Sequence, residues 1–229
     1  MTRMDPTTVR QRLKRLVQAD DDGLPLARTS LLIAQEEYLD LDRCAYKRKL
    51  ASMARAVRSR CDRSDIGPKC LAAIGEQMFQ IERFRGNAEG YYDPRNSFLS
   101  DVLDRKLGIP ITLSIIYLEL CWRTGVSAVG VGLPGHFIVR VDVGELIYVD
   151  PFNSGAKLDL AACAEKFRQV HGQSTTFHPS MLAPVGRRQI LFRVLANLKS
   201  IYLKCADYGR ALAAIDRTPN VIVAFFPVL

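Results

Sequence analysis

The 229-residue sequence lacks a long apolar run and lacks paired cysteines, and these absences exclude several classes of protein. Its N-terminal stretch, residues 1–22, is polar and charged, unlike the apolar core of an export signal. No stretch approaches the ~18 apolar residues of a membrane span. The six cysteines are scattered without a C-x-x-C pair, so we expect reduced thiols. The sequence therefore predicts a soluble, cytoplasmic protein that does not contact a membrane.

Acidic residues are fewer than basic ones, and the net charge of +8 permits a nucleic-acid partner. However, much of this excess is local, because eight basic residues and one acidic residue lie between Arg43 and Arg63. That segment is a basic helical pattern without interleaved exposed aromatic residues, which disfavours binding of single strands by stacking. A solvated helix face explains it equally well. We therefore expect a protein or peptide partner rather than a nucleic acid.

The spacing of apolar residues predicts a mixed architecture of the α+β class. A helical period recurs in six segments before Gly125, at residues 9–17, 26–38, 44–58, 68–81, 98–105 and 111–122. The sixth segment is apolar nearly all round and should be the buried centre of the protein. The period then changes to two, which predicts strands at residues 126–131, 137–143 and 146–149. A helix at 158–170 and a helical hairpin at 188–217 complete the expected elements.

The same pattern divides the chain into four parts. Residues 1–25 form an N-terminal helix and linker, and residues 26–171 form the main domain. A loop rich in serine, threonine, histidine and proline makes residues 172–186 a linker. The helical hairpin occupies residues 187–229. We expect its second helix to stop at Thr218-Pro219-Asn220, and the apolar residues 221–229 are atypical, as in an altered or truncated terminus prone to aggregation.

Candidate site residues lie at the start of the central helix and at the ends of two strands. His136 follows a Pro-Gly turn before one strand, and Asp150 ends the next. With a nucleophile at a helix start, this is the order of a Cys–His–Asp acyl-transfer site. A turn histidine and a capping aspartate are the plainer explanation. One histidine and one carboxylate fall short of the three protein ligands usual in catalytic zinc sites, so we expect neither metal nor cofactor.

Four short motifs carry a resemblance to a known family. They are Asp93-Pro94-Arg95-Asn96, Gly108-Ile109-Pro110, Pro134-Gly135-His136 and Asp150-Pro151-Phe152. Together they resemble the transglutaminase-like (papain-like) domain, and more specifically the SirB-type bacterial proteins. The resemblance implies a helical core packed on a small antiparallel sheet, followed by a tetratricopeptide-like helical hairpin. It also places His136 and Asp150 at the second and third catalytic positions.

The first catalytic position departs from that family. In active transglutaminase-like domains the catalytic cysteine lies about fifteen residues before the glycine that ends the central helix. In this sequence, counting back from Gly125 leads to Pro110. Ser114 and Thr112 on the same helix are the replacement nucleophile candidates, against an interpretation as buried hydroxyls bonded to the preceding turn. Cys44 or Cys163 could enter from elsewhere, whereas Cys121 is expected in the core. The residues expected to line a binding groove are Asn96, Pro110, Gly135 and Phe152.

Two functional hypotheses follow. The sequence favours a non-enzyme, a transglutaminase-like protein that acts as a regulatory or peptide-binding scaffold with a vestigial or structural His136–Asp150 pair. The alternative is a hydrolase or acyl transferase that uses the hydroxyl of Ser114 or Thr112, with His136 as base. A covalent probe for reactive hydroxyls would separate them.

Overall fold

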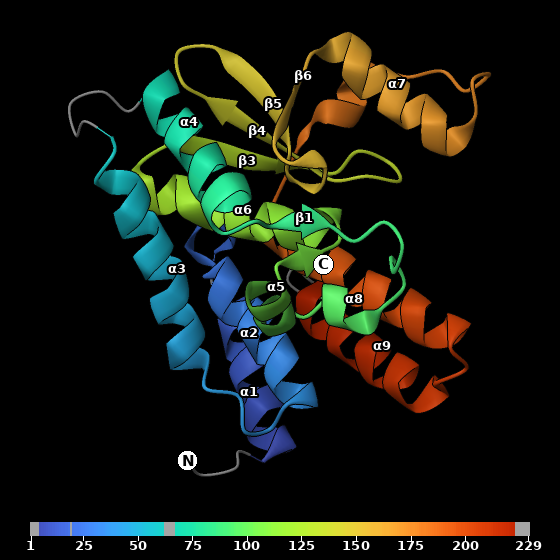
Figure 1. Cartoon of the computed structure of the whole chain (residues 1–229). Helices are drawn as coiled ribbons and strands as arrows, with labels where there is room; N and C mark the ends of the chain where they lie inside the picture. Colours follow the sequence, from blue (N-terminus) through green and yellow to red (C-terminus); the bar gives the residue numbers. More distant parts are fainter. Residues whose placement is uncertain (1–4, 19, 62–66, 223–229) are drawn as a thin grey trace.

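The computed structural model describes residues 5–18, 20–61 and 67–222, with the backbone alone for Pro6 and residues 217–222 (Figure 1). Its α-helices are α1 (Pro6–Val17), α2 (Leu26–Glu37), α3 (Arg43–Arg58), α4 (Pro68–Gly75), α5 (Leu99–Arg105), α6 (Pro110–Thr124), α7 (Leu160–His171), α8 (Arg187–Lys204) and α9 (Tyr208–Ile222). Its strands are β1 (Arg85–Gly86), β2 (Leu107–Gly108), β3 (Ser127–Val131), β4 (Ile138–Asp142), β5 (Leu146–Asp150), β6 (Ala156–Leu158) and β7 (Pro184–Val185). Short helical turns are η1 (Asp21–Gly23), η2 (Glu76–Ile81), η3 (Pro94–Asn96), η4 (Pro151–Asn153) and η5 (Pro179–Leu182).

Helix α6 is the buried centre of the molecule, as the sequence predicts. Every residue from Pro110 to Cys121 is buried. Proline suits the first helical position because the N–H group it lacks has no intrahelical partner there. The helix ends at Gly125, whose φ of +86° belongs to the left-handed region that glycine adopts without strain.

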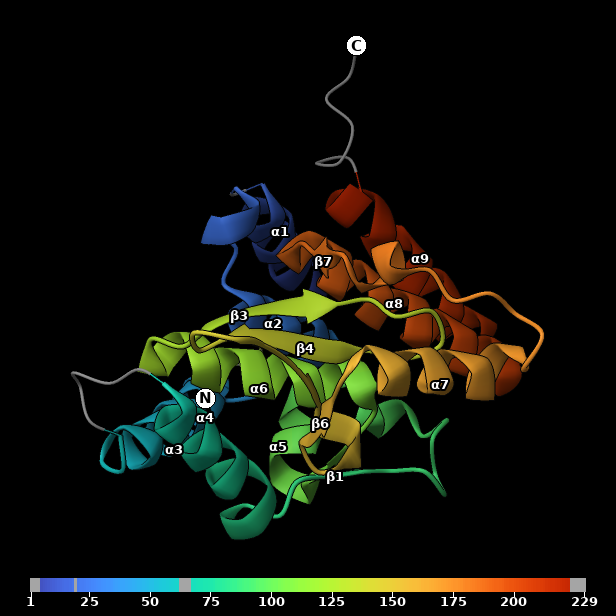
Figure 2. The same cartoon turned by 90° about the horizontal axis from the view of Figure 1, so that it is seen from above.

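The main sheet is antiparallel and has the strand order β6-β5-β4-β3-β7. Its two faces belong to different cores. Val139 and Val141 of β4 join the main core around α6, whereas Ile138 packs with Cys163 and Phe167 of α7 in a smaller one. Figure 2 shows β3 and β4 lying alongside α6, with which both strands are in contact. The α+β class is thereby confirmed.

Several predicted element bounds need correction. The sheet also contains β6 and β7, which are too short for their alternation to be read from the sequence. The helix predicted from residue 158 begins later, because Leu158 ends β6 and the Asp159 carboxylate caps α7 by accepting the N–H of Ala162. The segment 68–81 is an α-helix only to Gly75 and continues as the π-helical turn η2.

The end of the chain also differs from the expectation. Helix α9 continues through Thr218-Pro219-Asn220 to Ile222, where the sequence predicts a stop. A proline removes one hydrogen bond of the helix and need not end it. Residues 223–229, most of the apolar tail, lie outside the described part of the chain.

The hairpin of α8 and α9 is fastened to the N-terminal segment. The Asp21 carboxylate accepts the backbone N–H groups of Arg187 (2.7 Å) and Arg188 (2.9 Å) and so caps α8 across 166 residues of sequence. Gly186 makes this approach possible, because a Cβ there would lie 2.4 Å from Asp21 Oδ2. Helices α1 and α9 are also in contact. No helix within the described ranges is long and apolar enough to cross a membrane.

Candidate functional site

His136 is placed by a tight turn between β3 and β4. Its backbone N–H donates to the Leu133 carbonyl (2.9 Å), and Pro134 and Gly135 occupy the corner. The φ of +75° at Gly135 is what the third position of a type II turn requires. Arg193 of α8 donates to the carbonyls of both Leu133 (3.3 Å) and His136 (3.1 Å). The turn that presents the imidazole is therefore fixed from both sides.

Asp150 is placed by the end of β5. Its Oδ1 accepts the backbone N–H groups of Phe152 (3.1 Å) and Asn153 (3.3 Å), and its Oδ2 accepts the Asn153 side-chain amide (2.7 Å). These bonds turn the chain into η4 and keep the carboxylate in one orientation. The residue has no solvent-exposed surface.

The two side chains meet directly. His136 Nε2 lies 2.9 Å from Asp150 Oδ2, and the Lys166 ammonium of α7 lies 2.8 Å from the same oxygen. Burial alone would raise the pKa of Asp150, but the hydrogen bond and charge of His136, then Lys166 and Asn153, outweigh it. The pKa of Asp150 is consequently held well below its usual range, so the carboxylate stays ionised.

An aromatic ring packs against the imidazole, and a second ring supports the first. The Phe152 ring meets His136 edge-on, with centroids 6.0 Å apart at 85°, and Tyr91 meets Phe152 in the same way at 6.3 Å. Gly86 of β1 makes room for this ring, because a Cβ there would lie 2.6 Å from it. The His136 side chain keeps 13% of its surface exposed, so it can still be reached from solvent.

The start of α6 supplies no hydroxyl to His136. Pro110 is buried, and the Thr112 hydroxyl donates to the Asn96 carbonyl (2.7 Å). Ser114 is fully buried, and its Oγ has no hydrogen-bond partner in the described structure. Among the described residues, Asp150 is the hydrogen-bond partner of the His136 ring. The Thr112 hydroxyl thus caps the start of α6, whereas no described hydrogen bond explains the position of the Ser114 hydroxyl.

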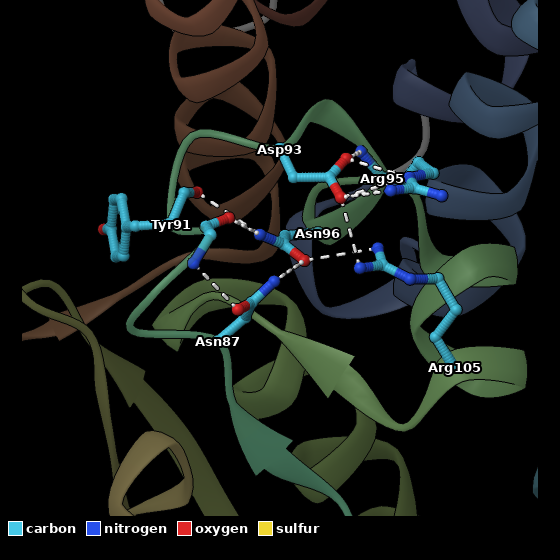
Figure 3. Close-up of polar contacts among 7 residues, drawn as sticks. Asn87, Tyr91, Asp93, Arg95, Asn96 and Arg105 are labelled. Atoms are coloured by element: carbon cyan, nitrogen blue, oxygen red, sulfur yellow. Dashed lines mark hydrogen bonds and ion pairs between the residues drawn. The ribbon is translucent and has the colours of Figure 1, made fainter.

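Asn96 lies at the centre of a buried polar cluster in the loop before α5 (Figure 3). Its amide donates to the Gly90 (2.7 Å) and Tyr91 (3.3 Å) carbonyls. Its oxygen accepts from Asn87 (3.1 Å) and Arg105 (3.3 Å). Because the Asn96 carbonyl also accepts the Thr112 hydroxyl, this cluster joins the loop to the start of α6. The Asn96 side chain, which the sequence predicts to line a groove, is therefore buried and hydrogen-bonded inside the protein.

The cysteines lie away from the imidazole or are unsuited to attack. Cys121 and Cys163 are fully buried, whereas Cys44 is exposed on α3. Burial, with the nearby Asp159 and Asp150, raises the pKa of Cys163 to about 11, so its thiol stays protonated at neutral pH. Within the described ranges, no three histidine, cysteine, aspartate or glutamate side chains gather as a metal site would need.

The structure brings together some of the residues named from sequence and adds others. His136, Asp150 and Phe152 are in contact, and Gly135 shapes the turn before them. Lys166 and Arg193 were missed, because they come from helices far along the chain and no local pattern points to them. The turn after Asp150 could have been found, since an aspartate followed by proline at a strand end is a capping signal, but no local pattern points to the Asn153 side chain.

Comparison with known sequences places this geometry in a family. A family model described as the transglutaminase-like superfamily matches residues 44–196. The chain is 39% identical over 211 residues to a UPF0162 protein of Xylella fastidiosa (strain 9a5c), covering 90% of this chain and 75% of that protein. It is 33% identical over 141 residues to a UPF0162 protein of Vibrio cholerae, covering 61% of this chain and 52% of that protein.

A more distant similarity reaches a protein of Homo sapiens. The chain is 29% identical over 146 residues to F-box only protein 21, which covers 60% of this chain and 22% of that protein. No solved structure matches significantly. The extent of the family match and the identity to the Xylella protein show that this chain belongs to the transglutaminase-like superfamily, among the bacterial UPF0162 proteins.

Proposed function

We propose that this protein is a non-catalytic transglutaminase-like scaffold that binds a protein or peptide segment in a regulatory role. The observation that carries the proposal is a His136–Asp150 pair that is fully supported yet has no described thiol or hydroxyl bonded to its imidazole. Acyl transfer requires a nucleophile within hydrogen-bond reach of its base. In this interpretation the pair joins the His136 turn to the end of β5 and carries no chemistry.

A hydrolase or acyl transferase that uses Ser114 is the alternative. The observation in its favour is the buried Ser114 Oγ, which lacks a hydrogen-bond partner among the described residues. A buried hydroxyl without a partner costs free energy, and such groups recur at functional sites. Thr112 is a weaker candidate, because its hydroxyl already caps α6 and bonds to the loop.

Covalent labelling separates the two proposals. We expect a fluorophosphonate probe and an activated acyl ester to label the wild-type protein no more than the Ser114→Ala and His136→Ala variants. Labelling of the wild type that both variants abolish would establish the enzyme and overturn the scaffold. The His136→Gln variant is a useful companion, since it keeps a hydrogen-bond donor for Asp150 and guards against a mere folding defect.

The partner surface is proposed on two separate features. A pocket of about 390 Å³ lies beside the turn after Asp150, and its lining includes Phe79, Tyr117 and Lys157. Lys157 belongs to β6, the exposed edge strand of the sheet. An edge strand beside a partly apolar pocket can accept an extended peptide as an additional strand.

The second feature is the α8–α9 hairpin, which we propose to be tetratricopeptide-like, as in SirB-type proteins. Its helices pack side by side, and the buried small residues Ala211 and Ala214 allow their close approach (Figure 1). A neighbouring face of α9 carries three exposed apolar side chains at helical spacing, Tyr208 (69%), Leu212 (59%) and Ile215 (43%). An exposed apolar stripe of this kind suits a protein partner.

Site-specific photo-cross-linking tests this surface. A benzophenone amino acid would replace Lys157 or Leu212 in the cell, and Glu145, exposed in the β4–β5 turn, would be the control position. We expect the same polypeptide to cross-link from positions 157 and 212 but not from 145. Excess unlabelled protein should compete, and its Leu212→Glu variant should compete less. Equal cross-linking from position 145, or none from the other two, would contradict the proposed surface.

A further inference from the structure

A second pocket lies at the junction of three helices and is lined mainly by arginine. It has a volume of about 510 Å³ and is formed by α1, α2 and α3, which pack in sequence order (Figure 1). Its lining consists of four arginines and two leucines: Arg12, Arg15, Leu16, Arg28, Leu32 and Arg43. No acidic residue belongs to it.

The four guanidinium groups have no counter-charge in the part of the chain that the structure describes. None of them takes part in a side-chain hydrogen bond or an ion pair with a described residue. The acidic residues of the flanking helices are engaged elsewhere. Glu36 lies 3.8 Å from Arg10, and Asp42 accepts the first N–H groups of α3 and lies 3.6 Å from Arg48.

The positions of two of these arginines are also electrostatically unfavourable. Arg28 lies in the first turn of α2 and Arg43 is the first residue of α3. The N-terminal end of a helix carries a partial positive charge, which favours anions and disfavours cations. Burial, and then the charges of Arg12 and Arg28, lower the pKa of Arg43, so these groups are close enough to repel one another.

We propose that this pocket binds a small molecule bearing a phosphate or pyrophosphate group. A planar guanidinium pairs with phosphate oxygens through two parallel hydrogen bonds, and the pocket contains arginine but no lysine. Its volume falls in the range of about 300–1,000 Å³ usual for small-molecule sites. Leu16 and Leu32 provide an apolar wall for the rest of the ligand.

A nucleic-acid backbone is the other polyanion to consider, and the geometry disfavours it. The charges converge on a concavity at one junction instead of following an extended path. The lining also lacks an aromatic side chain on which a base could stack. The proposal therefore commits to a compact ligand, and an oligonucleotide serves as the competing probe.

Titration calorimetry with inorganic pyrophosphate at low ionic strength tests the pocket directly. We expect about one pyrophosphate to bind per chain, and the Arg28→Gln/Arg43→Gln variant to bind at least about tenfold more weakly. Arg55→Gln is the matched control, because Arg55 is exposed on α3 but does not line the pocket. It should bind pyrophosphate with an affinity within about twofold of the wild type.

Thermal unfolding provides an independent readout that a folding defect would not mimic. Without ligand, the Arg28→Gln/Arg43→Gln variant should unfold about 1–4 °C above the wild type, because repulsion is relieved. Pyrophosphate should raise the unfolding temperature of the wild type and of Arg55→Gln, but not of the double variant.

Three results would overturn the proposal. Pyrophosphate could fail to bind the wild type, or the control could lose as much affinity as the double variant. A 12-nucleotide single strand could also bind more tightly than pyrophosphate and weaken equally in both variants. That third result would assign the charge to an extended nucleic-acid surface.

Discussion

At the scale of single residues, Asp150 is the most constrained group in the site. It accepts hydrogen bonds from two backbone N–H groups, from Asn153 and from His136, and it pairs with Lys166. A buried carboxylate with this many donors is stable only while it is ionised. Its charge state therefore links the site to the stability of the fold.

Acid should weaken the protein through Asp150. The folded-state pKa of this group is lowered, so its contribution is present above its unfolded pKa of ~4 and is lost as pH falls below that value. We expect Asp150→Asn to lower the free energy of unfolding by roughly 2 kcal/mol at pH 7, with a smaller difference from wild type at pH 3. Urea unfolding at both pH values measures this.

The control is Asp40→Asn, since Asp40 is exposed in the loop after α2. It should follow the wild type at both pH values. A constant difference between Asp150→Asn and wild type from pH 7 to pH 3 would show that the charge of Asp150 does not contribute in the way we describe.

At the scale of elements, the loop from Asn87 to Ser97 sets where α6 begins. Asp93 is paired with Arg95 (2.8 Å) and Arg105 (3.1 Å), and Asn96 joins both edges of the loop. The loop has η3 as its regular structure, so its shape depends on these polar contacts. Loss of one buried member should disturb both the loop and the helix after it.

Asn96→Ala should lower the free energy of unfolding by about 2–3 kcal/mol, because it leaves several buried donors and acceptors without partners. Arg95→Ala is the control from the same cluster: Arg95 is 58% exposed, so its ion pair with Asp93 is screened by solvent. Chemical denaturation of both variants gives the comparison. If Arg95→Ala were as damaging as Asn96→Ala, burial would not be the reason for the role of Asn96.

Some elements could be predicted from the sequence and others could not. The apolar run of α6, its proline start and its glycine end were readable because each is a local signal. The three longer strands were readable from their alternation. The strands β6 and β7 have three and two residues, too few for any period to appear, and they depend on their neighbours in the sheet.

The same distinction explains the site. His136 lies just before one predictable strand and Asp150 lies at the end of the next. Their proximity could therefore be expected from the hairpin that these two strands form. Lys166 and Arg193 reach the site from α7 and α8, and their role depends on packing that no local spacing encodes. The arginine pocket is likewise assembled from three separate helices.

At the scale of the whole molecule, the N-terminal segment and the C-terminal hairpin hold each other. Arg187 donates to the Leu24 carbonyl (2.9 Å) and lies over the Trp122 ring at 4.0 Å, while Arg188 donates to the Val17 carbonyl (3.0 Å). With the Asp21 cap, these contacts tie α8 to both α1 and the central helix. The hairpin is packed against the molecule, α8 against α2 and α6 and α9 against α1 (Figures 1 and 2).

Asp21→Ala should lower the free energy of unfolding by about 1–2 kcal/mol, because the first N–H groups of α8 lose their acceptor. Asp22→Ala is the matched control, since Asp22 is exposed and caps no helix. Hydrogen exchange of the Arg187 and Arg188 amides would locate the effect. Equal losses in both variants would point to the general charge of the segment.

The contact between Asp21 and α8 also sets an order of events during synthesis. One partner is made near the start of the chain, whereas the other is made 166 residues later. Long-range contacts of this kind slow folding, because the intervening chain must be ordered before they form. The N-terminal helix thus emerges from the ribosome long before its final neighbour exists. Until α9 is complete, the part of α1 that packs against α9 is an exposed surface that a chaperone can recognise.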